Sequence, residues 1–469
     1  MMNSQSRRSI RREHVITLLM KFVLIIVFIN GRGPACVEGA EPAFRAAPVY
    51  RPDDRRPLRD DARAASLGIQ KYTSRHLILY TDIDPQIART LPPLINQIMP
   101  AWEAYFGELP PARDGSDFQM TCYLMQDQER FAAAGMQPEG VMLTRFGRQI
   151  GREFWMLEQS GDYYRRHLFF HEATHAFMTT LPSVLPPLWY LEGMAEYFAT
   201  HSIDDRGRIT FGIMPIAPEQ VPEWGRIELI RQENFYRRTL SLPQIGAMTN
   251  DQFIQPRPVP YSWSWAVCSF LDRHPRYQDR FRQLGQNMEY SAFQRLMEEL
   301  FEPDRRLLAA EWGEFARRLD YGFDIPANAF LSRPSRSWSN GETVTIEVAS
   351  RQGWQSTGLH VDGGKSVSIQ ATGQVQLKPG TVPWVSEPQG ISLDYAGGFP
   401  VGTLLAAWLP LASAVDEETE IQLEVTPVGS GATITASKSS ELWLRINDHG
   451  DDLHNNEGSY HVEITGVRN

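Results

Sequence analysis

The chain has 469 residues, of which 42% are hydrophobic, and a formal net charge of −10 at pH 7. This composition is typical of a globular protein and excludes a disordered chain, and the length favours two folded domains. Because no basic cluster remains beyond the first forty residues, we expect no binding to nucleic acid.

The first forty residues have the pattern of an export signal. Pairs of arginines at 7–8 and 11–12 precede an apolar run over 15–29, and small residues follow at 37–40. Lys21 interrupts the run, which is short for a membrane span of about 20 residues. We therefore expect an exported protein (periplasmic, at the cell surface or extracellular) whose residues 1–40 are a signal peptide. An uncleaved membrane anchor is the competing interpretation.

Elements expected further along the chain suggest an α+β protein. Residues 41–66 are rich in Pro, Arg, Asp and Ala without apolar periodicity, which predicts a flexible linker. Strands are expected at 76–81, 118–125 and 152–157, with an amphipathic helix over 84–106 and mainly helical patterns from 228 to 320. Cys122 and Cys268 allow either one disulfide or two buried thiols.

The most informative motif is His171-Glu172-Ala173-Thr174-His175. It falls in an apolar stretch without helix breakers, which runs from Gly161 to Pro182 and predicts a largely buried helix. Histidines four residues apart lie on one helix face, so both imidazoles can bind one metal ion. The glutamate beside the first histidine would then be the general base for a metal-held water. Ordinary polar packing of two histidines is the competing interpretation.

A second helix is expected at 189–200, after a proline-rich turn, with Glu192 and Glu196 one turn apart. Carboxylates on an otherwise apolar helix are costly unless they are paired or bind a metal. We therefore expect Glu192 to be the third metal ligand and Glu196 to be its supporting partner.

These residues together, with Trp189-Tyr190-Leu191-Glu192-Gly193, resemble the gluzincin (peptidase MA-like) zinc metallopeptidases. The likeness extends from about 72 to 321 and is nearest to an uncharacterised group of secreted bacterial proteins. It implies that His171, His175 and Glu192 bind zinc, that Glu172 is the base, and that Glu196 orients His171. Sixteen residues separate His175 from Glu192, fewer than in the aminopeptidase branch, so Glu196 stays open as a minor alternative ligand.

The same resemblance suggests two further features of a peptidase domain over 67–326. Gluzincins pair an edge strand with extended substrate, a role that Phe154 to Leu157 would fill unless they form an ordinary edge strand. They also place a Tyr or His near the oxyanion, which makes Tyr261 a candidate; a packed aromatic is the alternative.

After residue 326 the pattern changes to short alternating segments divided by Gly, Pro and Asn, which predicts an all-β sandwich over 330–469. Its last segments resemble the calcium-dependent galactophilic lectin of bacteria. That likeness implies calcium ligands at Asp448, Asp452, Asn455 and Asn456, with a backbone carbonyl near Leu377. An Asn-Gly hairpin with solvated acids is the alternative. The lectin's other sugar-contacting residues have no clear match over 384–398.

We therefore expect a secreted zinc metallopeptidase, acting on a peptide or protein substrate, whose C-terminal module targets cell-surface glycan. The alternative is an inactive gluzincin-fold protein used for carbohydrate binding or adhesion. Membrane association is expected only if the N-terminal segment stays uncleaved.

Overall fold

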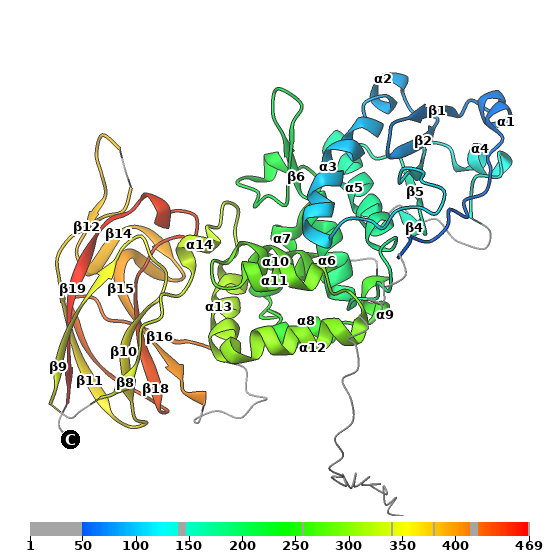
Figure 1. Ribbon diagram of the computed structural model, residues 1–469. Coiled ribbons are helices and arrows are strands. Elements are labelled where there is room, and N and C mark those ends of the chain that lie inside the picture. The colour runs from blue at the N-terminus through cyan, green and yellow to red at the C-terminus, as the bar shows by residue number, and fades with distance from the viewer. Residues whose placement is uncertain are drawn as a thin grey trace, which may run out of the picture. The chain divides into compact units, whose positions relative to one another are not determined.

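The computed structural model describes residues 49–138, 147–255, 258–338, 341–378, 380–412 and 421–467. Figure 1 shows an α+β protein, with a sheet and many helices in the first part of the chain and an all-β unit in the last part. The predicted signal peptide, residues 1–40, lies outside the described residues. Within the described ranges, no helix is both long and apolar enough to cross a membrane.

The described end of the predicted linker forms a short helix, α1 (Asp61–Ser66), capped by the Asp60 side chain. Just before it, the Arg59 guanidinium donates to Glu153 at 2.9 Å and lies over the Tyr123 ring at 5.2 Å. Residues 49–66 thus form a helix and side-chain contacts where a flexible linker was expected. Composition alone did not reveal that their arginines have partners on the neighbouring sheet.

The N-terminal sheet has five strands in the order β1-β2-β3-β5-β4. Its parallel centre is β2 (Leu77–Thr81), β3 (Met120–Met125) and β5 (Glu153–Leu157), and the outer strands β1 (Gln70–Thr73) and β4 (Arg148–Ile150) run antiparallel to their neighbours. The predicted strands are therefore confirmed, but the prediction that Phe154 to Leu157 form an edge strand is wrong. A tight turn at Gly151 brings β4 back along β5, so that Gln149 pairs with Phe154.

Two helices replace the single one predicted over 84–106. They are α2 (Pro85–Ala88) and α3 (Pro92–Phe106), and the break comes where Pro92 and Pro93 cannot donate the hydrogen bonds that would continue α2. The apolar face of α3 is buried, with Ile95, Ile98 and Trp102 at 0% exposure. It packs with the sheet and with α5 (Asp162–Met178), the helix of the histidine motif.

The remaining N-terminal elements are mostly helical, as predicted for 228–320. They comprise α4 (Gln128–Ala133), α6 (Leu188–Ala199), the hairpin β6 (His201–Ile203) and β7 (Ile209–Phe211), η1 (Pro218–Gln220), α7 (Arg226–Phe235), α8 (Leu242–Gly246), α9 (Asn250–Phe253), α10 (Val259–Arg273), α11 (Gln278–Gly285), α12 (Tyr290–Phe301), η2 (Glu302–Asp304), α13 (Arg305–Arg318) and α14 (Ile325–Asn328).

Cys122 on β3 and Cys268 on α10 are both free and fully buried. The disulfide that the sequence left open is therefore not formed, and the alternative of two buried thiols is correct. Burial raises the pKa of each thiol well above its usual value, which keeps both in the unreactive protonated form.

The C-terminal unit has the two packed sheets that the sequence predicted. One six-stranded sheet has the order β14-β15-β18-β10-β8 with β16 beside β15, and the other has β13-β12-β19-β11-β17 with β9 beside β19. Their inward residues share one apolar core, with Ile369, Leu444 and Ile464 at 0% exposure. The strands are β8 (Arg336–Ser337), β9 (Thr343–Ala349), β10 (Gln355–Val361), β11 (Ser366–Thr372), β12 (Val375–Gln376), β13 (Val385–Ser386), β14 (Gln389–Ala396), β15 (Phe399–Pro410), β16 (Glu424–Pro427), β17 (Gly431–Thr435), β18 (Ser440–Ile446) and β19 (Glu457–Gly466), with η4 (Leu453–Asn455) before β19.

Candidate metal centre

Helix α5 carries the histidine motif through the interior of the protein. It begins after Gly161, ends at Met178 shortly before Pro182, and is buried along most of its length. His171 and His175 are 6% and 8% exposed, so the two imidazoles share one buried helix face, as their spacing predicts.

Helix α6 begins directly after Pro187 and carries Glu192 and Glu196 toward α5. It lies very close to α10, because a Cβ atom on Gly193 would stand 2.6 Å from both Cys268 Sγ and the Ser264 carbonyl oxygen. Only glycine fits this approach. The glycine that follows Glu192 therefore lets α6 pack deeply enough for Glu192 to reach the histidines.

Three side-chain atoms from α5 and α6 converge on one point. Glu192 Oε2 lies 3.3 Å from His171 Nε2 and 3.2 Å from His175 Nε2, and the two nitrogens are 3.1 Å apart. Donors bound about 2.0 Å from a tetrahedral zinc ion would lie about 3.3 Å from each other. The triangle therefore fits a small metal ion with three protein ligands and an open fourth position.

The charges at this triangle depend on one another. Burial raises the pKa of Glu192, but the neighbouring His175 and His171 outweigh this effect and lower the pKa to about 2. This carboxylate is therefore ionised. Burial lowers the pKa of His171, while Glu192 and Glu196 raise it well above its usual value. In the absence of metal the carboxylates thus hold a proton on the imidazole that a cation would replace.

Glu172 lies on the same helix and is 5% exposed. Burial raises the pKa of Glu172 to about 7, against the lowering effect of His171 and His175, which suits a group that takes up and returns a proton near neutral pH. Gly147, just before β4, crowds this carboxylate: a Cβ there would stand 2.5 Å from Glu172 Oε1. The backbone at Gly147 therefore limits where the carboxylate can lie.

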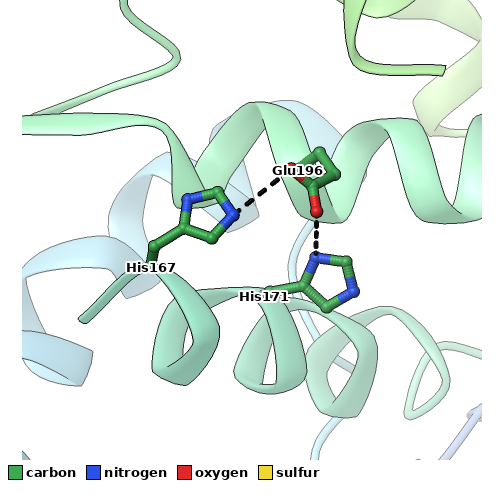
Figure 2. A group of neighbouring side chains, drawn as sticks. All are labelled: His167, His171 and Glu196. Carbon is green, nitrogen blue, oxygen red and sulfur yellow. Dashed lines mark ion pairs between the residues drawn. The ribbon is translucent and has the colours of Figure 1, made fainter. Parts of the chain in front are cut away.

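Glu196 forms a second group with His167 and His171, and Figure 2 shows its carboxylate between the two imidazoles. Its oxygens lie 3.2 Å from His167 Nε2 and 3.4 Å from His171 Nδ1. The Arg226 guanidinium donates to both oxygens, at 2.9 and 3.0 Å. Burial raises the pKa of Glu196, but Arg226 and His167 lower it well below its usual value. Because Arg226 already supplies a cation here, the first triangle is the better metal site.

Tyr261, in the first turn of α10, lines the same cavity as the three candidate ligands, a space of about 440 Å³. Its ring centre lies 6.1 Å from that of His171 and 5.2 Å from that of Phe253. Burial and then Glu192 raise the pKa of Tyr261, so its hydroxyl keeps a proton that it can donate. The position is compatible with both sequence interpretations, oxyanion donor and packed aromatic.

The loop from Asp448 to Asn456 brings the predicted calcium ligands into two contacting pairs. Asn456 Nδ2 donates to Asp448 Oδ2 at 2.9 Å, and Asn455 Nδ2 donates to Asp452 Oδ1 at 3.2 Å. Burial raises the pKa of Asp448, and the charge of Asp452 raises it further. Lys378, next to the predicted carbonyl donor Leu377, lies 3.6 Å from Asp452.

Two amide oxygens in this loop are left without partners. Asn455 Oδ1 and Asn456 Oδ1 are buried and have no hydrogen bond within the described part of the chain. Buried acceptors are rarely left unsatisfied. Amide and carboxylate oxygens such as these and those of Asp448 are the hard ligands that calcium prefers.

Three residues of the metal centre were not identified from the sequence: His167, Arg226 and Gly147. His167 alone had a visible signal, because it precedes His171 by one helical turn. Arg226 and Gly147 reach the site only through tertiary packing.

Comparisons with known proteins leave the family of the chain open. The sequence matches no protein-family model and no curated protein. Among solved structures, a PllA-like lectin, the N-terminal domain of EclA, is 20% identical and covers 26% of this chain and 95% of its own, with a TM-score of 0.21. PliG, a periplasmic inhibitor of g-type lysozyme from Aeromonas hydrophila, is 5% identical over 29% of this chain and 97% of its own, with a TM-score of 0.17. A conserved protein of unknown function from Bacillus anthracis is 14% identical over 27% of this chain and 22% of its own, with a TM-score of 0.16. Because all three TM-scores lie below 0.5, we draw no conclusion about activity from them.

Proposed function

We propose that the protein is a zinc-dependent peptidase that hydrolyses peptide bonds with Glu172 as general base. The observation that carries this proposal is the triangle of His171, His175 and Glu192, whose sides of 3.1–3.3 Å fit three ligands of one tetrahedral ion. An open fourth position is what distinguishes a catalytic zinc site from a structural one. The resemblance to gluzincins supports the same assignment.

Zinc bound at this triangle would polarise the scissile carbonyl and lower the pKa of the attacking water. Glu172 would take the proton from that water and deliver it to the leaving amine, for which its pKa of about 7 is well matched. Tyr261 would donate a hydrogen bond to the oxyanion that develops on the substrate carbonyl. In this proposal Glu196 orients His171 and is not a ligand.

The proposal assigns substrate positioning to β4 rather than to β5. Within the described part of the chain, β4 pairs only with β5, so its other edge has free backbone groups. Gly147, Arg148 and Gln149 line the same cavity as the candidate ligands. An extended peptide that added to this edge would lie beside the metal centre and Glu172.

The decisive experiment compares the wild-type protein with the Glu172→Gln variant. Both are assayed for bound zinc and for cleavage of an unfolded protein such as casein. We expect one zinc ion in each, and turnover lowered about 10²- to 10⁴-fold in the variant, because only the base is removed. Equal turnover with zinc bound would show that catalysis does not use Glu172. No turnover in either, with zinc bound, would favour the alternative of an inactive gluzincin fold.

We further propose that the C-terminal unit binds calcium at Asp448, Asp452, Asn455 and Asn456 and targets the peptidase to glycan. The two unpartnered amide oxygens support the calcium site. Calcium at a hundred times its dissociation constant should stabilise the wild type by about 2.7 kcal/mol. Asp448→Asn should abolish this shift in melting temperature. A melting temperature that ignores both calcium and chelator would remove the site.

The proposed peptidase is an exported protein. This part of the proposal depends on the signal-like pattern of residues 1–40, which lies outside the described residues.

A further inference from the structure

Two residues outside the proposed metal triangle contact the Glu196 carboxylate: Arg226 through two hydrogen bonds, and His167 at ion-pair distance. Arg226 Nε donates to Oε2 at 3.0 Å and Nη2 donates to Oε1 at 2.9 Å. His167 Nε2 lies 3.2 Å from Oε2, and His167 Nδ1 lies 3.1 Å from the Ala199 carbonyl oxygen at the end of α6. Glu196, Arg226 and His167 are 2%, 5% and 1% exposed, so water does not compete for these contacts.

Arg226 is itself fixed by the backbone around it. Its Nη1 donates to the Trp224 carbonyl oxygen at 3.2 Å, and Gly225 adopts a left-handed conformation, with φ of 58°, to start α7. The Trp224 ring is buried and meets the Trp265 ring of α10 edge-on, with ring centres 4.6 Å apart. The guanidinium is therefore attached to a packed part of the structure and can hold the Glu196 carboxylate in a fixed position.

A carboxylate gripped in this way cannot rotate freely. A two-pronged guanidinium contact fixes the plane of the carboxylate as well as its position. Oε1 then lies 3.4 Å from His171 Nδ1, an ion-pair distance without a hydrogen bond among the described residues, while Nε2 of the same ring belongs to the metal triangle. Figure 2 shows that Glu196 lies between the imidazoles of His167 and His171.

We propose that Arg226 and His167 are positioning residues that clamp Glu196 and thereby fix the ring of His171 for metal binding. This inference rests on the proposed zinc site. The clamp joins α5, α6 and α7 at one carboxylate, and α5 and α6 carry all three ligands. It therefore sets both the orientation of His171 and the spacing between the ligand-bearing helices.

The principal test measures whether Arg226 acts through Glu196. Zinc dissociation constants are determined by competition with a chromophoric chelator for the wild type, Arg226→Lys, Glu196→Gln and the double variant. Arg226→Lys keeps the charge but loses the two-pronged contact. We expect Arg226→Lys to weaken zinc about 10- to 100-fold in the wild-type background, as loss of an outer-shell partner does. In the Glu196→Gln background the same change should have little further effect, because the carboxylate that it positions is gone.

The second test uses cobalt as a spectroscopic probe of the ligand geometry. The visible spectrum of the Co²⁺ form should change in Arg226→Lys and in His167→Asn. Matched controls are Arg231→Lys, an exposed arginine of the same helix, and His201→Asn, a buried imidazole that lies 2.8 Å from the Ala199 carbonyl oxygen without touching Glu196. Both controls should keep the wild-type spectrum and zinc affinity. Melting temperatures of the zinc-free proteins identify any variant that fails to fold.

If Arg226→Lys is unfolded, a double variant that removes both charges replaces it. This variant is Arg226→Met with Glu196→Gln, and its zinc affinity is compared with that of Glu196→Gln alone. Unchanged zinc affinity in Arg226→Lys would overturn the clamp, as would an equal loss in both backgrounds. In those cases zinc binding and Glu172-dependent turnover persist in the wild type, so the proposed function survives. A wild type that binds no zinc overturns both proposals together.

Discussion

In the proposed peptidase, Gly147→Ala should impair catalysis while leaving the metal in place. The added Cβ would stand 2.5 Å from Glu172 Oε1, whereas ordinary contacts begin at 3.4 Å, so the carboxylate must move by 0.9 Å, the difference between the two. The Cβ would also stand 2.9 Å from Cγ and Cδ of Glu172, so the buried side chain must turn away as a whole. A displacement of about 1 Å at a catalytic group can lower the rate about a hundredfold.

The φ angle of Gly147 is 77°, so alanine there also introduces backbone strain of about 1–2 kcal/mol. Gly151 provides the matched control, because its φ is 59° and no atom lies within 4 Å of an added Cβ. In urea unfolding we expect both alanine variants to lose the stability that the positive φ costs, and Gly147→Ala to lose more because of its clash with Glu172. Only Gly147→Ala should lose kcat/KM on an unfolded protein substrate, with zinc content unchanged. Equal activity in the two variants would refute the link between Gly147 and Glu172.

Three further predictions concern groups around the site. Tyr261→Phe should lower turnover about 10²- to 10³-fold without changing zinc content if the hydroxyl stabilises the oxyanion, and unchanged turnover would leave Tyr261 as a packed aromatic. Glu192→Ala should abolish stoichiometric zinc binding, whereas Glu196→Gln should keep one ion with about 10- to 100-fold weaker affinity; the reverse order would make Glu196 the ligand. Burial lowers the pKa of His201 to about 3, so between that pH and the unfolded value of about 6.5 the unfolded chain binds the extra proton. The free energy of unfolding should therefore fall by up to about 1.4 kcal/mol for each unit of acidification, and His201→Gln should have a shallower pH dependence than the wild type.

The candidate metal centre was largely predictable because its candidate ligands follow helical spacing. His171 and His175 are one turn apart on α5, and Glu192 and Glu196 are one turn apart on α6, so each pair shares a face whatever the rest of the fold does. Local pattern also identified the central strands of the sheet and the all-β C-terminal unit.

What the sequence did not reveal depends on contacts between distant segments. Arg226 lies thirty positions after Glu196, and the sequence around this arginine does not indicate that it pairs with a buried carboxylate. The three residues of β4 are too short and polar to stand out as a strand, so β5 was wrongly expected at the edge. Cys122 and Cys268 could not be assigned either, because only the packing of β3 and α10 shows that each thiol is free.

The close approach of α6 to α10 has a consequence for how such a site can vary among related proteins. A Cβ added at Gly193 would meet the Ser264 backbone and the Cys268 side chain, so the depth at which Glu192 sits depends on the sizes of the side chains at positions 193 and 268. A larger residue at 193 would lift α6 and withdraw the ligand, and a larger residue at 268 would do the same from the opposite side. We therefore expect positions 193 and 268 to be inherited as a pair of small residues wherever Glu192 is retained.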